Sequence, residues 1–287
     1  MRVLVTGAAG MLGQAVMPAL AAAGHAARGT DLPEHDVTRL DRLRRAVDGF
    51  QPDWVLHLAA FTRVDECESR RDEAFLVNET GARNAALAAE ACGAALLALS
   101  TDYVFDGTAT SPYRESDAAN PRSVYGASKW AGEQAVREVH ARHVIVRTSW
   151  LFGPGGTNFV DTILARARSG GPLRVADDQR GSPTFTRDLA QGLLRLVEAA
   201  RPGTYHCTNS GDCTWYDLAA HALALAGLDV PLERTDAASL QRPARRPAYS
   251  VLGNARFEQV TGWRMPPWQD AVGRHLAATV GATGRNP

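Results

Sequence analysis

Residues 2–13 read Arg2-Val3-Leu4-Val5-Thr6-Gly7-Ala8-Ala9-Gly10-Met11-Leu12-Gly13. The apolar run that ends at Thr6 predicts a buried strand, and the segment that begins at Met11 has the pattern of a helix. Glycines at 7, 10 and 13 permit a tight turn, let the backbone approach a pyrophosphate and allow the helix to pack closely on the sheet. The helix N-terminus would favour the anionic group. The spacing is G-x-x-G-x-x-G rather than G-x-G-x-x-G, and its place at a first strand–helix junction predicts nucleotide binding.

Short apolar runs and longer helical segments alternate from this junction to about residue 210. Strands are expected at 2–6, 25–30, 54–59, 94–100, 143–148 and 204–207, and helices at 11–23, 39–48, 71–92, 124–140, 158–169 and 186–199. Right-handed crossovers would wind these units into an α/β, doubly wound parallel sheet of the Rossmann type.

Glycine and proline become frequent after about residue 153, which indicates that the chain leaves the sheet there. We therefore expect residues 1–153 to form an NAD(P)-binding Rossmann domain, with a returning strand near 204–207. Residues 154–287 are expected to form mainly a second, smaller substrate-binding lobe.

Charge and composition narrow the classes of partner. The 287 residues carry 31 basic and 31 acidic side chains, a net charge of +0, which argues against a nucleic-acid surface. No apolar run approaches the roughly 20 residues of a membrane helix, and the N-terminus lacks the apolar region of a signal peptide, so a cytoplasmic location is predicted. The 4 cysteines have neither CxxC pairing nor the histidine spacing of a zinc site, so no metal is expected.

Lys129 is the only lysine in the chain, and it follows Tyr125 by four residues in Tyr125-Gly126-Ala127-Ser128-Lys129. Arginine serves most surface roles but cannot match a compact ammonium with three donors. On a helix, the two side chains would share one face, and an ammonium near a phenol lowers its pKa from about 10 toward neutral pH. The pair predicts a tyrosine that gives a proton to a carbonyl oxygen as hydride reaches the carbon. The lysine could also bind the nicotinamide ribose.

A third group is needed to hold the carbonyl. Ser100-Thr101-Asp102-Tyr103 follows the expected strand at 94–100, at the sheet edge where ligands bind in such folds. A hydroxyl group is well placed there, and we prefer Thr101 to Ser100.

Two charged side chains near the end of the second strand favour different cofactors. Asp31 comes 18 residues after Gly13, close to the position of an acid that holds the adenosine ribose 2′-hydroxyl of NADH. Arg28 could instead receive the 2′-phosphate of NADPH, or be a solvated arginine. NADPH or NADH is therefore expected, and the choice between them stays open.

These residues resemble the extended short-chain dehydrogenase/reductase superfamily. Within it, the run Ser100-Thr101-Asp102-Tyr103-Val104-Phe105-Asp106-Gly107 resembles the dTDP-4-dehydrorhamnose reductase family. The resemblance covers about residues 1 to 270, and its other motifs are Asp36-Val37-Thr38, Ala59-Ala60-Phe61-Thr62-Arg63-Val64-Asp65, Val77-Asn78, Arg147-Thr148-Ser149-Trp150, Gly181-Ser182-Pro183-Thr184 and Arg246-Pro247-Ala248-Tyr249-Ser250.

The resemblance implies an NAD(P)H-dependent oxidoreductase that reduces the 4-keto group of dTDP-4-dehydro-6-deoxy-L-mannose, a dTDP-linked ketosugar, to dTDP-L-rhamnose. It implies Thr101, Tyr125 and Lys129 as the catalytic residues. Substrate-binding residues would be Thr101, Asp102, Tyr103, Trp150 and Arg246. Cofactor-binding residues would be Gly7, Gly10, Met11, Leu12, Gly13, Asp31, Asp36, Val37, Ala59, Ala60, Thr62, Asn78, Tyr125 and Lys129.

Two of these assignments have plain structural alternatives. Asn78 could be a helix-surface amide rather than a residue that supports the active site. Arg246, with Arg242 and Arg245, could clamp the substrate diphosphate because guanidinium matches phosphate geometry, or could belong to a solvated basic loop.

Several alternatives concern the activity itself. Related nucleotide-sugar 4,6-dehydratases place an Asp-Glu pair after the catalytic threonine because elimination needs a second acid and base, whereas Asp102-Tyr103 here favours a simple ketoreductase. The substrate could be another dTDP-deoxysugar of secondary metabolism. A non-catalytic regulatory subunit of the methionine adenosyltransferase type shares this fold, but the set of Thr101, Tyr125 and Lys129 argues against it. A homodimer is left open, and no acidic set matches the magnesium site of some family members.

Overall fold

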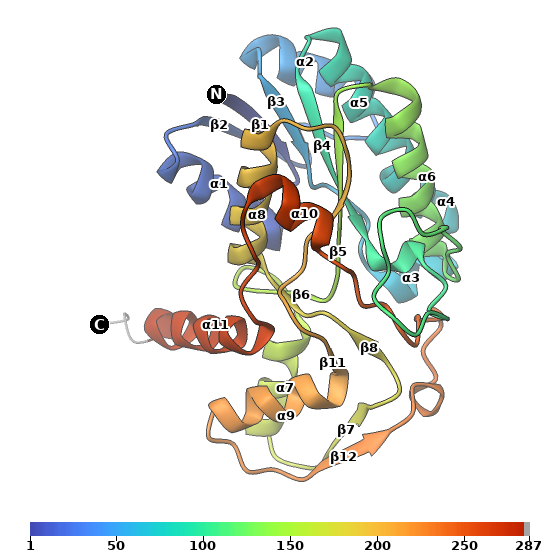
Figure 1. The fold of residues 1–287 in the computed structure, drawn as a ribbon, viewed down its shortest axis with the longest axis vertical. Coiled ribbons are helices and arrows are strands. Elements are labelled where there is room, and N and C mark those ends of the chain that lie inside the picture. Colours follow the sequence, from blue (N-terminus) through green and yellow to red (C-terminus); the bar gives the residue numbers. More distant parts are fainter. Residues whose placement is uncertain (284–287) are drawn as a thin grey trace.

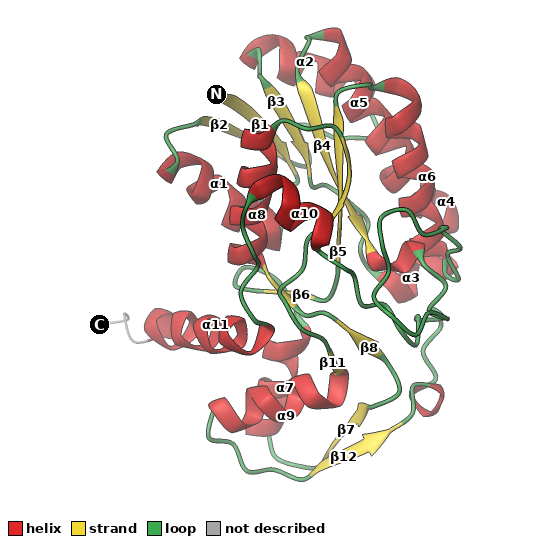
Figure 2. Ribbon diagram, in the orientation of Figure 1, coloured by secondary structure: helices red, strands yellow, loops and turns green. Residues whose placement is uncertain are grey.

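A six-stranded parallel sheet forms the centre of the larger part of the molecule (Figures 1 and 2). The computed structural model describes residues 1–283, so the last four residues of the expected substrate lobe lie outside the described part. All neighbouring strands of the sheet are parallel. They run in the order β10 (Gly203–His206), β5 (His143–Thr148), β4 (Ala95–Thr101), β3 (Trp54–His57), β1 (Arg2–Thr6) and β2 (Ala26–Thr30).

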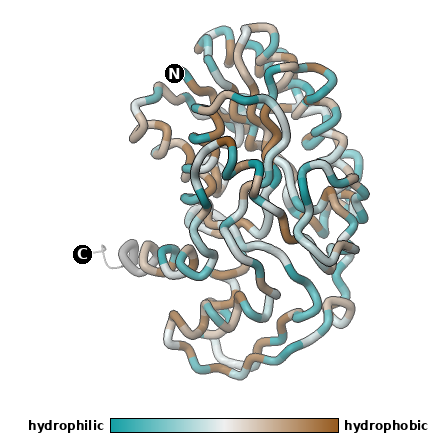
Figure 3. Tube along the Cα trace, in the orientation of Figure 1, coloured by the Kyte–Doolittle hydropathy of each residue, from teal (hydrophilic) through white to brown (hydrophobic). Residues whose placement is uncertain are grey.

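The doubly wound parallel sheet and its six strands are confirmed, with strand ends within two residues of the predicted ones. The strands were recognisable because a parallel sheet covered on both faces needs nearly continuous apolar runs. Val3, Leu4 and Val5 are fully buried, and Figure 3 shows hydrophobic residues concentrated along the central strands. From β1 the chain passes to β2 on one side and to β3 on the other, so ligands are expected at the carboxyl ends of these strands.

Helices cover both faces of the sheet. On one face, α1 (Met11–Ala22), α8 (Thr186–Ala199) and α10 (Ala255–Thr261) contribute to a buried cluster that includes Leu20, Leu193 and Phe257. The other face is covered by α2 (Leu40–Phe50), α5 (Gly81–Ala91) and α6 (Val124–Val139). Thus α8 and α10 pack on the central sheet although they follow residue 153. The boundary predicted near that residue stays a prediction.

The predicted helix at 71–92 contains a π-helical turn and is preceded by a separate short helix. The structure has α3 (Val64–Ser69), α4 (Arg71–Phe75), one π-helical turn η1 (Leu76–Thr80) and then α5. Residues 71–91 are therefore helical as predicted, and the wider turn within them was not predicted. The wider turn contains the buried Asn78, whose side chain bonds the backbone of Phe61, and π-turns of this kind are frequent at functional sites.

The smaller part of the molecule lies below the carboxyl edge of the sheet in Figure 1. Its helices α7 (Phe159–Arg168), α9 (Trp215–Leu225) and α11 (Trp268–Thr283) contribute to a separate buried cluster. Three two-stranded sheets accompany them: β7 (Leu173–Ala176) with β12 (Leu232–Thr235), β8 (Arg180–Gly181) with β11 (Cys213–Thr214), and β6 (Leu151–Phe152) with β9 (Thr184–Phe185). Short 3-10 turns lie at η2 (Asp102–Val104) and η3 (Ala238–Leu240).

The chain passes between the central sheet and the smaller part several times. It leaves after β5, returns for α8 and β10, leaves again for β11 and α9, returns for α10 and ends in α11. Within residues 1–283, none of the helices has the length and apolar character that crossing a membrane requires.

Candidate active site

The loop between β1 and α1 lies at the carboxyl edge of the sheet. Gly7 has a φ of +71°, and a Cβ on it would lie 2.7 Å from the backbone nitrogen of Ala59. Only glycine allows this approach of the loop to the residues after β3. Gly10 caps α1 without a side-chain hydrogen bond, so the first amides of this helix are not capped by a side chain and can face an anion.

A cavity of about 630 Å³ extends from this loop to α6, and we call it the cofactor cavity. Its volume is in the range of sites that hold a small molecule or cofactor. The predicted cofactor-binding residues that line it are Gly7, Gly10, Met11, Leu12, Gly13, Asp31, Asp36, Val37, Ala59, Ala60, Thr62, Tyr125 and Lys129.

Asn78 is the predicted cofactor-binding residue that does not line this cavity. It is buried, its Oδ1 accepts a hydrogen bond from Phe61 N at 2.8 Å, and its Nδ2 donates to Phe61 O at 3.1 Å. The same Nδ2 donates to Ser128 Oγ at 2.9 Å, next to Lys129 in the chain. Asn78 is thus no surface amide, since it joins the loop after β3 to α6.

The two side chains expected to choose the cofactor face different ways. Asp31 lines the cofactor cavity, and its Oδ2 accepts a hydrogen bond from Ala9 N in the glycine loop at 2.8 Å. The guanidinium of Arg28 instead lies over the ring of Phe50, 4.8 Å from its centroid, and bonds the carbonyl of Gly49. Arg28 is therefore directed to α2, away from the cavity wall.

Tyr125 and Lys129 lie on α6, and both line the cofactor cavity. The helix begins directly before Tyr125, because Ser123 caps it and accepts a hydrogen bond from Gly126 N at 3.1 Å. Such a cap stabilises the first turn and so fixes where Tyr125 lies. The ring of Tyr125 packs edge-on against Tyr103, with 5.5 Å between the centroids.

Burial dominates the protonation of this pair. Lys129 is buried, its Nζ donates a hydrogen bond to Leu99 O at 2.7 Å, and desolvation lowers its pKa to about 8 while the charge of Glu133 opposes this. Desolvation raises the pKa of Tyr125 above its ordinary value, and a hydrogen bond with Thr101 acts in the opposite direction. The predicted lowering of the phenol pKa is therefore wrong for this structure: desolvation raises the pKa, and the Lys129 charge is not among its main causes.

The hydroxyl groups of Ser100 and Thr101 have different partners. Ser100 Oγ donates a hydrogen bond to the buried Glu133 Oε1 at 2.6 Å, which directs it into the protein. Thr101 Oγ1 accepts from Tyr103 N at 3.3 Å and donates to Asp102 Oδ1 at 3.0 Å. Since Thr101 also interacts with the Tyr125 phenol, it is the better placed of the two for a carbonyl near that phenol.

Asp102 is a buried carboxyl group on the wall of the cofactor cavity. Burial raises its pKa to about 6, although hydrogen bonds with Ser250 and Thr101 favour the charged form. Its protonation state therefore changes close to neutral pH.

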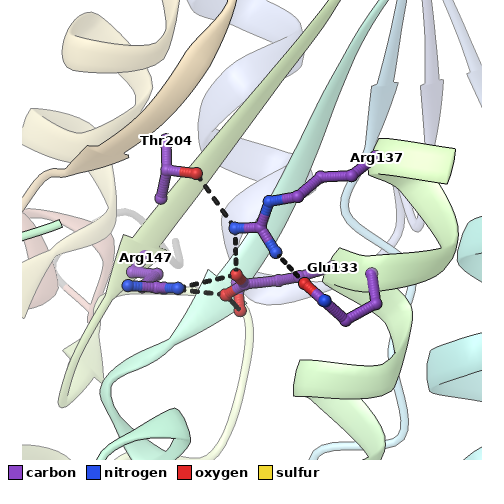
Figure 4. A network of polar contacts seen from close by, with 6 residues as sticks. Glu133, Arg137, Arg147 and Thr204 are labelled. Carbon is purple, nitrogen blue, oxygen red and sulfur yellow. Dashed lines mark hydrogen bonds and ion pairs between the residues drawn. The ribbon is translucent and has the colours of Figure 1, made fainter. Parts of the chain in front are cut away.

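Glu133, four residues after Lys129 on α6, is the centre of a buried polar network (Figure 4). Arg147 donates to its two carboxylate oxygens from Nε and Nη2, each at 2.8 Å. Arg137 Nη2 donates to Glu133 Oε2 at 2.7 Å and to Thr204 Oγ1 at 3.0 Å. Burial would raise the pKa of Glu133, but the hydrogen bonds and charge of Arg147 hold it below its ordinary value. The network joins α6 to β5 and β10, and so holds the helix that carries Lys129 against the sheet.

A second cavity of about 740 Å³ adjoins the first, and we call it the lobe cavity. Its walls include five arginines, which would favour an anionic ligand such as a diphosphate. They are Arg166, Arg174, Arg242, Arg245 and Arg246. The residues that line both cavities mark the place where they meet, and these are Val64, Tyr103, Trp150, Leu151, Thr157 and Trp215.

Arg246 has a protein partner as well as a place on this wall. Its Nη1 and Nη2 donate to the two carboxylate oxygens of Asp65 at 3.0 and 2.9 Å, and Ala244 N donates to the same carboxylate at 3.2 Å. Arg246 therefore holds its loop against α3, whereas Arg242 and Arg245 are exposed. Among residues 1–283, no group of three or more His, Cys, Asp or Glu side chains is placed to hold a metal ion.

Sequence reasoning missed several residues of the two cavities. Trp215, Thr157 and Arg166 come from the smaller part of the chain, where no motif connects them with the glycine loop. Glu133 could have been found, because its four-residue spacing from Lys129 places both on one helix face.

Comparisons with known proteins agree with this arrangement. The family model described as RmlD substrate binding domain matches residues 1–280. The chain belongs to this family. The resemblance to the dTDP-4-dehydrorhamnose reductase family is confirmed by relatives of that name.

Three of the similar proteins illustrate the range of names and sequence identities. A dTDP-4-dehydrorhamnose reductase of Streptomyces griseus is 43% identical, with 99% of this chain and 96% of the relative covered. A probable dTDP-4,6-dihydroxy-2-methyloxan-3-one 4-ketoreductase of Streptomyces antibioticus is 41% identical, with 95% and 93% covered. The crystal structure of dTDP-4-dehydrorhamnose reductase from Bacillus anthracis in complex with NADP is 36% identical, with a TM-score of 0.94 and coverage of 96% and 99%.

Proposed function

We propose that the chain reduces the 4-keto group of dTDP-4-dehydro-6-deoxy-L-mannose with NAD(P)H and so forms dTDP-L-rhamnose. The observation that carries this proposal is the position of Thr101, Tyr125 and Lys129 on the wall of the cofactor cavity, which adjoins the arginine-lined lobe cavity. A nucleotide-linked ketosugar has the anionic and carbonyl groups that this pair of cavities can receive. Membership of the family and the names of the relatives support the choice of substrate.

The residues of the cofactor cavity fit a nicotinamide dinucleotide. The cradle around Gly7 and the uncapped amides of α1 suit its pyrophosphate, and the Asp31 carboxylate suits the adenosine ribose. When bound, the reduced nicotinamide supplies the hydride that reaches C4 of the sugar.

The other part of the reaction is a proton transfer by this chain. Tyr125 would donate its phenolic proton to the O4 oxygen, so that the carbonyl becomes a hydroxyl group. The raised pKa of Tyr125 keeps the phenol protonated at neutral pH, as a proton donor must be. Thr101 would hold the carbonyl oxygen by a hydrogen bond, and the Lys129 ammonium would bind the nicotinamide ribose and stabilise the phenolate that remains.

The lobe cavity would hold the rest of the substrate. Arg242, Arg245 and Arg246 would contact the diphosphate, because a guanidinium group can donate two parallel hydrogen bonds to phosphate oxygens. Tyr103 and Trp150 line both cavities, so the sugar would lie between them and Tyr125. This placement supports a substrate-binding role for the smaller lobe.

A second candidate is reduction of a different dTDP-deoxysugar at C4. The Streptomyces antibioticus relative, named as a probable 4-ketoreductase of another dTDP-sugar, favours this alternative. Both candidates use the same proton donor and hydride source and differ only in the sugar.

The test generates the ketosugar in place from dTDP-glucose with a 4,6-dehydratase, with and without a 3,5-epimerase, and follows NADH and NADPH oxidation. Consumption that requires the epimerase supports an L-rhamnose-forming reductase, whereas consumption without it supports a D-sugar reductase. No oxidation in either mixture would contradict the L-rhamnose-forming reductase and would move the weight to a dTDP-deoxysugar that neither mixture contains. The cytoplasmic location and the homodimer stay predictions.

A further inference from the structure

Trp150 has a backbone conformation that is unusual for a bulky side chain. Its φ is +47°, in the left-handed region where a large L-residue is strained. The other non-glycine residues with positive φ in the described part of the chain are Gln51, Ala200 and Gln241, and each caps the C-terminus of a helix. That conformation is ordinary at a helix end. Trp150 instead lies between β5 and β6, on the wall shared by both cavities.

Two contacts form a slot for the indole ring of Trp150. The ring stacks on Trp215, with 3.5 Å between centroids and 7° between planes. A Cβ on Gly181 would lie 2.5 Å from Trp150 Cε2, so the indole lies directly against the bare backbone of this glycine. Phe159 supports the outer ring of the stack, 4.6 Å from Trp215.

The short β8–β11 strand pair positions both Gly181 and Trp215, the two sides of this slot. Gly181 pairs with Cys213 in the β8–β11 sheet, and Trp215 follows two residues after Cys213, at the start of α9. The helix is capped there by Thr214, whose Oγ1 accepts a hydrogen bond from Asp217 N at 3.1 Å. The slot is therefore built from secondary structure rather than from a loose loop.

We propose that Trp215 and Gly181 are positioning residues that hold Trp150 as an aromatic wall for the sugar ring, and so raise the affinity for the ketosugar. This inference rests on the proposed function. With its faces covered by Trp215 and Gly181, Trp150 presents the edge of its indole to the cavities. An apolar aromatic edge suits the C–H groups and C6 methyl group of a 6-deoxyhexose, which the arginines of the lobe cavity would not favour. Because the wall lines the cavity that contains Tyr125, its displacement would move the sugar carbonyl relative to the proton donor.

Two variants test the slot from opposite sides. Trp215→Ala removes the stacking partner, and Gly181→Ala places a methyl group where the indole of Trp150 lies, without a positive φ that would itself oppose alanine. The matched control is Trp263→Leu, since Trp263 packs near Phe257 and lines neither cavity.

The measurement compares two ligands by titration calorimetry in the presence of NADP⁺, which cannot supply hydride. The ligands are dTDP-4-dehydro-6-deoxy-L-mannose, generated from dTDP-glucose by the 4,6-dehydratase and the 3,5-epimerase, and dTDP, which differ by the sugar. Each slot variant should raise the dissociation constant of the ketosugar roughly tenfold and leave that of dTDP unchanged. Both should also abolish the exciton couplet that stacked indoles give in far-ultraviolet circular dichroism, whereas the control should alter neither ligand affinity nor couplet.

The outcomes distinguish failure of the slot proposal from failure of the proposed function. Unchanged ketosugar affinity in the slot variants would make the slot purely structural and overturn the inference. Wild-type protein that binds dTDP but no ketosugar would overturn the proposed function itself, before any variant is compared. If one variant fails to fold, the other gives the same decision.

Discussion

Replacement of Glu133 by glutamine tests how much the buried ion pair with Arg147 contributes to stability. Glu133→Gln keeps the side-chain shape and removes the negative charge that faces Arg147 in the network of Figure 4. Both side chains of the pair are 2% exposed, so the guanidinium would stay in the interior without its counterion. We expect a large loss in the free energy of unfolding.

The magnitude follows from the geometry. Unit charges 2.8 Å apart interact by roughly 6 kcal/mol at an effective dielectric constant of about 20. Removal of one partner of a buried pair costs about 3–5 kcal/mol in practice, because the remaining charge is left desolvated. This is a large part of the about 5–15 kcal/mol that stabilises a typical protein.

Urea denaturation at neutral pH, followed by circular dichroism, measures the change. The matched control is Glu138→Gln on the same helix, because its ion pair with Arg83 is exposed on both sides and should contribute less than about 1 kcal/mol. The double variant Glu133→Leu, Arg147→Met should recover much of the loss, since it removes both buried charges. A loss for Glu133→Gln no larger than that of the control would refute the reasoning.

Three further predictions concern the chemistry. Tyr125→Phe should lower ketosugar turnover at least about a hundredfold with the cofactor affinity unchanged, and normal turnover would exclude proton transfer by this residue. The pKa of Lys129 is about 8 in the folded protein against 10.5 ordinarily, so the unfolded state binds more protons between these values and stability should rise with pH there. Turnover that depends on the charged ammonium should instead fall as the pH rises above 8. The Lys129→Arg variant should turn over much more slowly, and its pH–rate profile should lack this decrease. Asp31→Ala should shift the ratio of kcat/KM values roughly tenfold from NADH toward NADPH, and an unchanged ratio would remove Asp31 from cofactor choice.

The fold was predictable from the sequence where burial on both faces requires a continuous run of apolar residues. The strands around Leu4 and Leu97 are covered on both faces, and their apolar runs identified them. The two-residue strands of the smaller part are too short to produce a periodic pattern. The π-turn at Asn78 was missed because the side-chain contacts that accompany it come from residues distant in sequence, Phe61 and Ser128.

The candidate site was also predictable only where the pattern is local in the sequence. The glycine loop and the Tyr125–Lys129 spacing are local patterns, and the structure brings them to one cavity. The direction of the Tyr125 pKa depends on how much water reaches the phenol, which a sequence does not reveal. Trp215 was missed because its relation to Trp150 depends on strand pairing between distant segments.

The repeated passage of the chain between the central sheet and the smaller part affects any attempt to redesign specificity. The arginines of the lobe cavity come from α7, β7 and the segment before α10. Between β7 and that last segment lie α8, which packs on the sheet, and β10, which belongs to it. A chimera made at a single junction would therefore exchange sheet packing together with the substrate walls. To transfer sugar preference between relatives, several short segments must be exchanged together. Each exchanged segment must be flanked on both sides by the recipient's own sequence.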